Sequence, residues 1–449
     1  MFDALFTTTT EYKKLSHALS GKGACALFGL PASGRAQVYA ALCRQLDKPL
    51  CIVTPGEAEA TRFAADLNTL GIPAAVFPAR DYVLRPIEGT AREYEYRRLA
   101  VLGELVGGRL RAVAVPAEAL TQFTTPKEDF CANTRTLHAG DTLLRDDLLA
   151  ALFGAGYTRR AQVDGPGQFS VRGDIVDIFA PDQKMPVRME FWGDEIDTLH
   201  TFDLTTQRRE DAIDKFYLSP AREVLFGKPA DAAEQLRAFL AKQRGKKKTA
   251  MADCMAADLD LLDGGAVPVN MDKYLAVRYP HPATVLDYFD DPILVAEEPA
   301  SIREADRATA YRRGEELKSL ILDGVLCAGL DNLYADPSYL WSKTGHYRTI
   351  CAENFARSMP DQPLKDIINA PAHTLPAWNG EVAGLLEDLK PLCDTGYTVT
   401  LLAGTDRAAA GLARDLRDKG ILVTTDAAAA PAAGLVQVLA GHLLSLINI

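Results

Sequence analysis

Residues 24–36, which read ACALFGLPASGRA, decide the fold class of this chain. The apolar run Ala24–Phe28 predicts a buried strand. The next eight residues, Gly29–Ala36, carry two glycines at the spacing of a phosphate-binding loop, G-x-x-x-x-G-K-[ST], and open a helix. Such glycines let backbone N–H groups curl around an anion at the helix N-terminus. A strand, a glycine loop and a helix in this order indicate an α/β protein.

Two positions of this loop depart from the phosphate-binding pattern. Arg35 stands where the pattern has lysine, and Ala36 stands where it has the hydroxyl that binds Mg²⁺. A guanidinium keeps the charge but is planar and bulkier, and a methyl group cannot bind a metal. Residues Gly29, Ser33, Gly34, Arg35 and Ala36 are therefore predicted to be the remnant of a nucleotide site. A strand-to-helix turn with two glycines by chance explains these eight residues equally well.

A second segment helps to choose between a nucleotide-site remnant and a chance glycine turn. The apolar run Ile293–Ala296 is followed directly by Glu297 and Glu298. In a P-loop NTPase an Asp–Glu pair stands there, where Asp orders Mg²⁺ and Glu polarises water. Because both halves of the metal site are altered, we expect a non-catalytic chain that binds no metal and no cofactor. For hydrolysis, the favoured interpretation is a buried strand that ends in solvated acids.

The rest of the first third alternates short apolar runs with amphipathic stretches such as Arg92–Val106. This alternation predicts a parallel sheet covered by helices. The predicted strands are Ala24–Phe28, Leu50–Thr54, Ala74–Phe77 and Ala112–Val115.

The period of the pattern changes between residues 125 and 216. Val187–Phe191 alternates strictly, Gly193–Asp194 offers a turn, and Ile196–Phe202 can return antiparallel. Phe169–Phe179 is predicted as a further strand. This patch interrupts the α/β pattern, so we predict an inserted α+β domain.

Five segments follow from these patterns. The α/β pattern resumes near Phe216, and a smaller set at the end contains the predicted strands Tyr397–Ala403 and Ile421–Thr425 around the helix Asp406–Leu416. The predicted segments are a first α/β part at 1–124, an inserted domain at 125–215, a second α/β part at 216–330, a linker at 331–345 and a small C-terminal α/β domain at 346–449.

The composition of the chain argues against several classes of function. The net charge of -11 argues against a general nucleic-acid binder, because counterion release needs a concentrated basic face. The eight cysteines form no Cys-x-x-Cys pair, which favours reduced thiols in the cytoplasm. We expect no signal peptide, and we expect the uncharged stretch Ala427–Ile449 to be a loop plus a core strand rather than a membrane span.

Four segments together resemble the excision-repair protein UvrB and its relative, the transcription-repair coupling factor (Mfd) family. They are Gly29–Ala36, Phe169–Phe179, Val187–Ile196 and Leu286–Phe289. UvrB carries an aromatic hairpin for probing DNA damage after its third strand, whereas here Phe77–Tyr82 runs almost directly into the next helix. The chain therefore resembles the N-terminal, UvrB-like region of coupling factors. That resemblance implies a RecA-like domain, an inserted α+β domain and a smaller C-terminal α/β domain.

The resemblance also implies partners. In both relatives, exposed arginines of the inserted domain bind the excision-repair protein UvrA. The matching positions here are Arg159, Arg172 and Ser170, the last of which departs from the family's arginine. Strand alternation places Phe169 and Val171 inward. It places Ser170 and Arg172 together on the opposite face. The family reaches RNA polymerase and duplex DNA through later modules that are missing here, so we expect a fragment of a longer protein.

Two rival functions remain open. A weak nucleotidase would use Arg35 and Glu297 and would bind nucleotide with Mg²⁺. A DNA-binding module would use the basic run Arg244–Lys248, for which a solvated loop is the simpler interpretation. Such a module would bind duplex DNA with a steep salt dependence.

Overall fold

The computed structural model describes residues 7–87, 92–357, 359, 362–372, 382–426, 429 and 432–441. Seven strands form one parallel sheet in the order β15-β1-β14-β13-β2-β4-β3. Their bounds are β1 (Gly23–Phe28), β2 (Leu50–Thr54), β3 (Ala74–Val76), β4 (Ala112–Pro116), β13 (Ile293–Glu297), β14 (Arg348–Glu353) and β15 (Leu364–Asn369). The α/β prediction is confirmed, and the four strands expected in the first third all lie in this sheet.

Helices cover both faces of the sheet, which is why its central strands are apolar throughout. Along β1, Cys25 and Leu27 pack into one core cluster, while Ala24, Ala26 and Phe28 pack into another. The first cluster is completed by α2 (Thr10–Ala18), α3 (Ala32–Leu46) and α4 (Glu57–Thr69). The second is completed by α5 (Glu93–Val106), α6 (Ala117–Leu120), η2 (Val285–Tyr288), α12 (Pro299–Leu322) and α13 (Tyr339–Lys343).

The predicted boundary at residue 346 is wrong. Strand β14 lies between β1 and β13, and β15 pairs with the outer side of β1, so residues up to 369 complete the large sheet. The segment predicted as a linker contains α13, whose Leu340 is buried in the core. An isolated apolar run shows that a strand exists but not which sheet it joins, because pairing partners can lie anywhere in the chain.

The inserted domain is a six-stranded sheet in the order β11-β10-β9-β8-β7-β6. Its strands are β6 (Thr158–Arg159), β7 (Gln168–Arg172), β8 (Ile175–Phe179), β9 (Val187–Trp192), β10 (Glu195–Phe202) and β11 (Arg209–Ala212). The predicted antiparallel return after Gly193 is confirmed. The single strand expected over residues 169–179 is instead a hairpin, because Gly173 adopts a φ of 61° and turns the chain.

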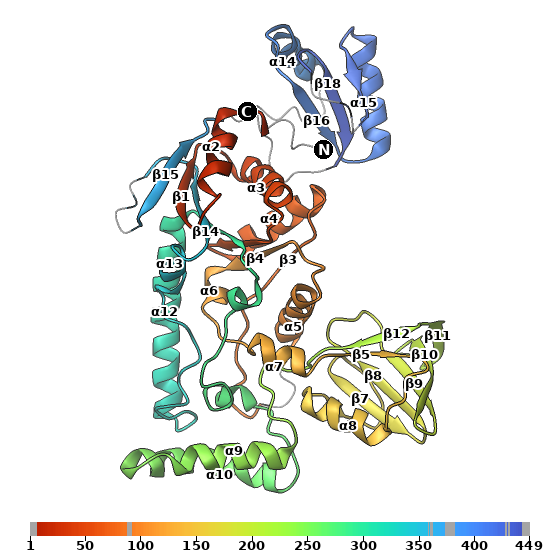
Figure 1. The fold of residues 1–449 in the computed structure, drawn as a ribbon, viewed down its shortest axis with the longest axis vertical. Helices are drawn as coiled ribbons and strands as arrows, with labels where there is room; N and C mark the ends of the chain where they lie inside the picture. Colours follow the sequence, from red (N-terminus) through yellow and green to blue (C-terminus); the bar gives the residue numbers. More distant parts are fainter. Residues whose placement is uncertain are drawn as a thin grey trace.

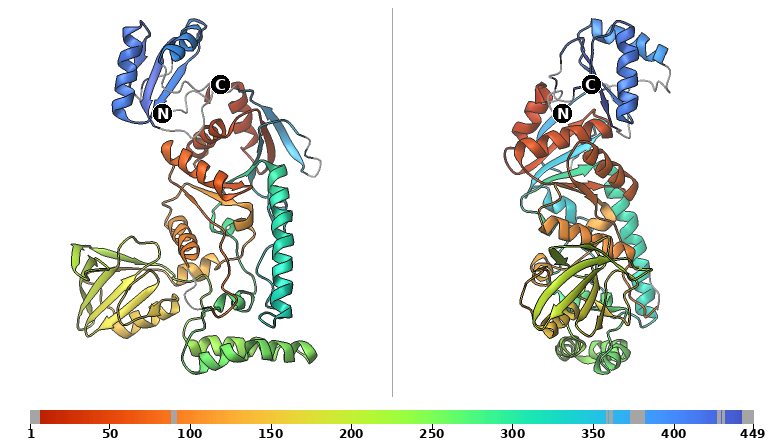
Figure 2. Two further views of the ribbon diagram at one scale, coloured as in Figure 1. Left: turned by 180° about the vertical axis from the view of Figure 1, so that it is seen from behind. Right: turned by 90° about the vertical axis from the view of Figure 1, so that its right-hand side faces the viewer.

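The entry to and exit from the inserted domain run side by side. Strand β5 (Arg135–His138) pairs antiparallel with β12 (Lys215–Leu218), so the domain ends after Leu218 rather than at residue 215. The helices α7 (Lys127–Ala132) and α8 (Arg145–Gly154) accompany this pair. The domain projects to one side of the parallel sheet in the yellow part of Figure 1 and in the left view of Figure 2.

A helical section follows at the end of the molecule remote from the C-terminal sheet (Figure 1). It contains α9 (Pro229–Ala241), α10 (Gly245–Asp263), η1 (Met271–Tyr274) and α11 (Leu275–Arg278). The basic run at Arg244 was expected to be a loop, but it caps and begins α10. Its lysines are exposed, as a solvated charge run should be.

The last part of the chain forms a separate three-stranded parallel sheet in the order β16-β18-β17. Its elements are α14 (Val382–Asp394), β16 (Val399–Ala403), α15 (Asp406–Asp418), β17 (Val423–Thr424) and β18 (Val436–Ala440). The predicted helix and both predicted strands are present here. The stretch after residue 426 supplies β18, while 442–449 lie outside the described residues. Across the described ranges, no helix is both long and apolar enough to cross a membrane.

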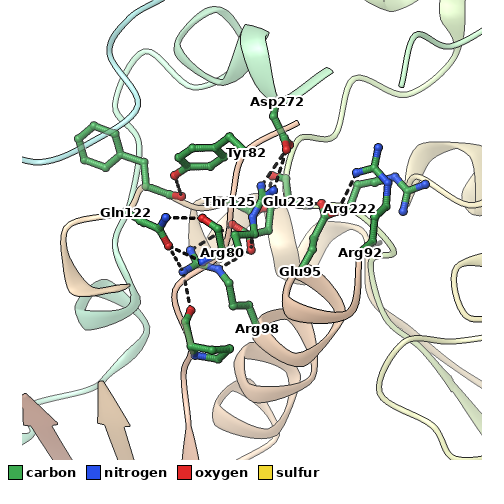
Figure 3. A network of polar contacts seen from close by, with 12 residues as sticks. Arg80, Tyr82, Arg92, Glu95, Arg98, Gln122, Thr125, Arg222, Glu223 and Asp272 are labelled. Atoms are coloured by element: carbon green, nitrogen blue, oxygen red, sulfur yellow. Dashed lines mark hydrogen bonds and ion pairs between the residues drawn. The ribbon is translucent and has the colours of Figure 1, made fainter. Parts of the chain in front are cut away.

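A buried polar network ties the inserted domain to the parallel-sheet domain (Figure 3). Arg98 of α5 has no solvent exposure, and its Nε lies 2.6 Å from Oε1 of Glu223, which follows β12. The backbone N–H of Glu223 donates to Glu95 of α5 at 2.9 Å. Arg80, in the loop after β3, adds ion pairs to Glu223 at 3.2 Å and to Asp272 of η1 at 2.7 Å. These bonds fix the exit of the inserted domain against α5.

Candidate functional site

The structure brings both halves of the predicted nucleotide site together. The loop after β1 leads into α3, which begins at Ala32, while Glu297 ends β13 and Glu298 caps α12. Arg35 lies between the two glutamates. Its Nη2 is 2.9 Å from Oε2 of Glu297, and its Nη1 is 2.9 Å from Oε1 of Glu298. Tyr39, one helical turn further along α3, donates its hydroxyl hydrogen to Glu297.

Burial distinguishes these groups from a solvated surface pair. Arg35 is 3% exposed and Glu297 is 1% exposed, so the prediction of solvated acids at the end of β13 is wrong for Glu297. Glu298 remains partly exposed. Burial raises the pKa of Glu297 to about 7, although Arg35 and Tyr39 both act to lower that pKa. Burial also opposes the charge on Arg35, but Glu297, Tyr39 and Glu298 together outweigh burial, so the pKa of the guanidinium is raised.

The first glycine of the loop packs against another part of the chain. Gly29 has a φ of 92°, and a Cβ there would lie 2.7 Å from the carbonyl oxygen of Ala370. The N–H of Ala370 donates to the carbonyl of Phe28 at 2.8 Å, so the residue after β15 packs directly against the loop. Ser33 is buried, and its hydroxyl has no hydrogen-bond partner within the described part of the chain. The described residues contain no cluster of three potential metal ligands.

The inserted domain presents the second predicted site. On β7, Phe169 is buried in the domain core and Val171 packs against that core, as alternation predicts. Arg172 lies on the opposite face, which we call the outer face, and its side chain is 47% exposed. Its Nη2 donates to Oδ2 of buried Asp177 on β8 at 2.6 Å. Asp177 also accepts from Arg188 of β9 at 2.7 Å, which fixes the carboxylate in place.

Ser170 is on the predicted face but is not available to a partner, because it is only 1% exposed. Its neighbour in the register is Asp177, which is itself held by Arg188. The guanidinium of Arg188 in turn lies 4.8 Å from the ring centre of Phe202, part of a small apolar cluster with Val163. This part of the outer face is therefore covered by side chains of the domain itself, which alternation within one strand could not reveal.

Arg159 is exposed at the edge of the sheet, but it does not share a face with Arg172. It pairs in parallel register with Phe169, and paired residues of parallel strands point to the same side. The next residue, Arg160, is also exposed and has the parity of the outer face. Sequence reasoning missed Arg160. The buried Tyr157 was the available signal, since alternation from an inward tyrosine places Arg159 on the same side.

Sequence reasoning also missed Trp192, which is 81% exposed at the end of β9. Arg188, Glu190 and Trp192 alternate along β9, so the tryptophan has the parity of the outer face. Glu190 pairs with Ile175, which pairs with Arg172, so Trp192 and Arg172 lie toward the same end of the sheet. An indole at an alternating polar position was the signal that the sequence offered.

The parallel-sheet domain thus carries a glycine loop closed by its own arginine, and it is interrupted by a six-stranded domain with an exposed arginine and tryptophan. In the comparison with known families, residues 136–224 match the UvrB interaction domain. That range contains the whole six-stranded sheet and β12.

The chain is also similar to individual known proteins. The chain is 25% identical over 431 residues to the transcription-repair-coupling factor of Bacillus subtilis (strain 168), which is 93% of this chain and 36% of the relative. It is 35% identical over 208 residues to that of Myxococcus xanthus, covering 44% of this chain and 17% of the relative. The chain is thus similar to part of these transcription-repair-coupling factors, and it spans about a third of the length of the Bacillus relative.

Proposed function

We propose that this chain is an adaptor of nucleotide excision repair that recruits the excision-repair protein UvrA to sites of stalled transcription. The observation that carries the proposal is the outer face of the inserted domain, where Arg172 and Trp192 lie exposed toward one end of the sheet. This face belongs to the segment that matches the UvrB interaction domain. The relatives' name couples transcription to repair, which supports the same role for this chain.

The geometry of Arg172 suits an interface. Its guanidinium is already held by Asp177, so less side-chain freedom is lost when a partner carboxylate binds the remaining N–H groups. Exposed Trp192 supplies the large apolar area that interface hot spots commonly use. Arg159 and Arg160 extend the positive charge along the β6 edge. The expected partner surface is therefore acidic, with an apolar pocket for the indole.

The decisive experiment measures binding of the whole chain to purified UvrA. Arg172→Glu and Trp192→Ala should each weaken binding by about 30-fold or more, the effect of losing a hot spot of ~2 kcal/mol. Arg208→Glu is the matched control, because Arg208 is an exposed arginine in the β10–β11 turn of the same domain. It should leave the dissociation constant within about 2-fold of wild type. Unchanged binding by both test variants would sink the proposed surface.

The degenerate nucleotide site is proposed to be inactive and to need no cofactor. Arg35 forms ion pairs with both Glu297 and Glu298, Ala36 offers no ligand to a metal, and Ala370 packs against the loop. Wild-type chain should show no saturable binding of ATP, with or without Mg²⁺, at ligand concentrations up to about 1 mM. Calorimetry beside a protein with an intact P-loop checks this expectation. Mg²⁺-dependent binding would favour the rival, a weak nucleotidase.

Contacts with RNA polymerase and duplex DNA are proposed to belong to parts of the relatives beyond the aligned third. This chain would then supply only the recruitment step of the longer protein. Its acidic balance of -11 agrees with a role in protein contacts rather than DNA binding.

A further inference from the structure

A pocket of about 210 Å³ lies between α12 and the segment 331–337, and its lining includes none of the residues of the two sites described above. Helix α12 runs along the edge of the molecule in Figure 1. The pocket walls are mostly apolar, and they include Ala310, Leu317, Ala335 and Pro337. Such a volume is below the usual range for drug-sized ligands or nucleotides, so it suits a group the size of one side chain.

Asp306 is the unexplained group of this pocket. Its side chain lines the pocket and the residue is only 7% exposed. Yet within the described part of the chain, the carboxylate of Asp306 makes no hydrogen bond and no ion pair. A buried carboxylate without a partner is costly, and such groups in native proteins commonly await a counter-ion or ligand.

The nearest cation does not satisfy Asp306. Arg313 lies on the same helix, but its Nη1 donates to the hydroxyl of Thr121 at 2.8 Å and its Nη2 donates to the carbonyl of Glu118 at 2.8 Å. Its guanidinium also lies over the ring of Tyr334, 4.0 Å from the ring centre. Arg313 is thus held against α6, and the carboxylate of Asp306 is left facing the pocket.

We propose that this pocket binds an ammonium or guanidinium group carried on a short apolar stem, with Asp306 as the counter-ion. A lysine or arginine side chain of a partner and a free alkylamine share this chemistry. The apolar walls would contact the stem, just as apolar surfaces in other proteins contact the methylene groups of lysine and arginine side chains. The pocket lies outside the inserted domain, so the site is independent of the proposed recruitment function.

The proposal implies a pH dependence. Burial raises the pKa of Asp306 to about 6, against the lowering effect of Arg313. The other polar groups that line the pocket are Thr121, Thr309, Asp331 and Tyr334. Because only the ionised carboxylate attracts a cation, binding should be strong above that pKa and should be lost as the pH falls below it.

The test titrates n-butylammonium into the full chain, followed by two-dimensional NMR. At about pH 7.5 we expect saturable shifts near α12 with a dissociation constant on the order of 1 mM, and at least a 10-fold weaker affinity at about pH 5. Asp306→Asn should abolish the shifts, whereas Glu304→Gln, an exposed acid on the same helix, should not. Equal binding by Asp306→Asn, or no saturable binding by wild type, would overturn the proposal.

A second variant separates binding from folding. Gly314 lines the pocket, and a Cβ there would meet no atom within 4 Å. Gly314→Leu should therefore fill the pocket, block n-butylammonium and leave the chain folded, with a melting temperature no lower than that of wild type. Unimpaired binding by this folded variant would overturn the site. A short peptide with one central lysine, titrated in parallel, distinguishes a side-chain site from a small-amine site, and binding by either probe supports the proposal.

Discussion

Arg35 makes a structural contact at a loop position where the phosphate-binding pattern has lysine. A lysine at this position reaches a phosphate as a point charge, whereas the planar guanidinium here spans Glu297 at the end of β13 and Glu298 after it. The side chain of Arg35 thereby joins α3 to the end of β13. Its role in this chain is therefore expected to appear in stability measurements rather than in turnover.

Removing Arg35 should leave Glu297 buried without its counter-ion. Arg35→Ala is expected to lower the free energy of unfolding by about 3–5 kcal/mol, the usual cost of breaking a buried ion pair. The double variant Arg35→Met/Glu297→Leu should recover most of that loss, because it removes both charges and keeps the volume. Urea denaturation of both variants beside wild type measures the difference. A single variant as stable as wild type would show that the ion pair does not form in solution.

At the scale of elements, the alternation of residues along a segment predicts its structure better than its position in the chain does. The alternation in β9 and β10 gave the hairpin and its faces, because period 2 is a local property. The burial of Ser170 depends on neighbouring strands and on the cluster around Phe202, which no single strand encodes. Alternation gives Trp192 and Arg160 the parity of the outer face, but only the register places Trp192 toward the same end of the sheet as Arg172.

The network around Arg98 makes its own prediction at this scale. Arg98→Met should lower the free energy of unfolding by about 3 kcal/mol or more, because Glu223 loses its closest charged partner in a site without solvent. The neighbouring Arg97→Met is the matched control. That side chain is 43% exposed and lies 3.7 Å from Glu57, so its loss should cost less than about 1 kcal/mol. Thermal and urea denaturation compare the two variants, and equal losses would contradict a structural role for the network.

At the scale of the whole molecule, the sequence predicted the three architectures but misplaced a boundary between them. The parallel sheet, the inserted domain and the small C-terminal sheet were each expected from periodicity and glycine spacing. What periodicity could not supply was the membership of β14 and β15, since apolar runs of similar length occur in both α/β parts. The resemblance to coupling factors suggested a partner, and the geometry shows which of the expected side chains are exposed.

The order of strands has a consequence for synthesis. Among the described residues, β1 pairs only with β14 and β15, although it precedes them by more than 300 positions. At a translation rate of about 5–20 residues per second, β1 leaves the ribosome tens of seconds before its neighbours exist. During that interval an apolar strand and its unpaired backbone are exposed to other nascent chains. A ribosome that stalls between the helical section and β14 would therefore release a product whose first strand has no sheet to join, a natural substrate for chaperones.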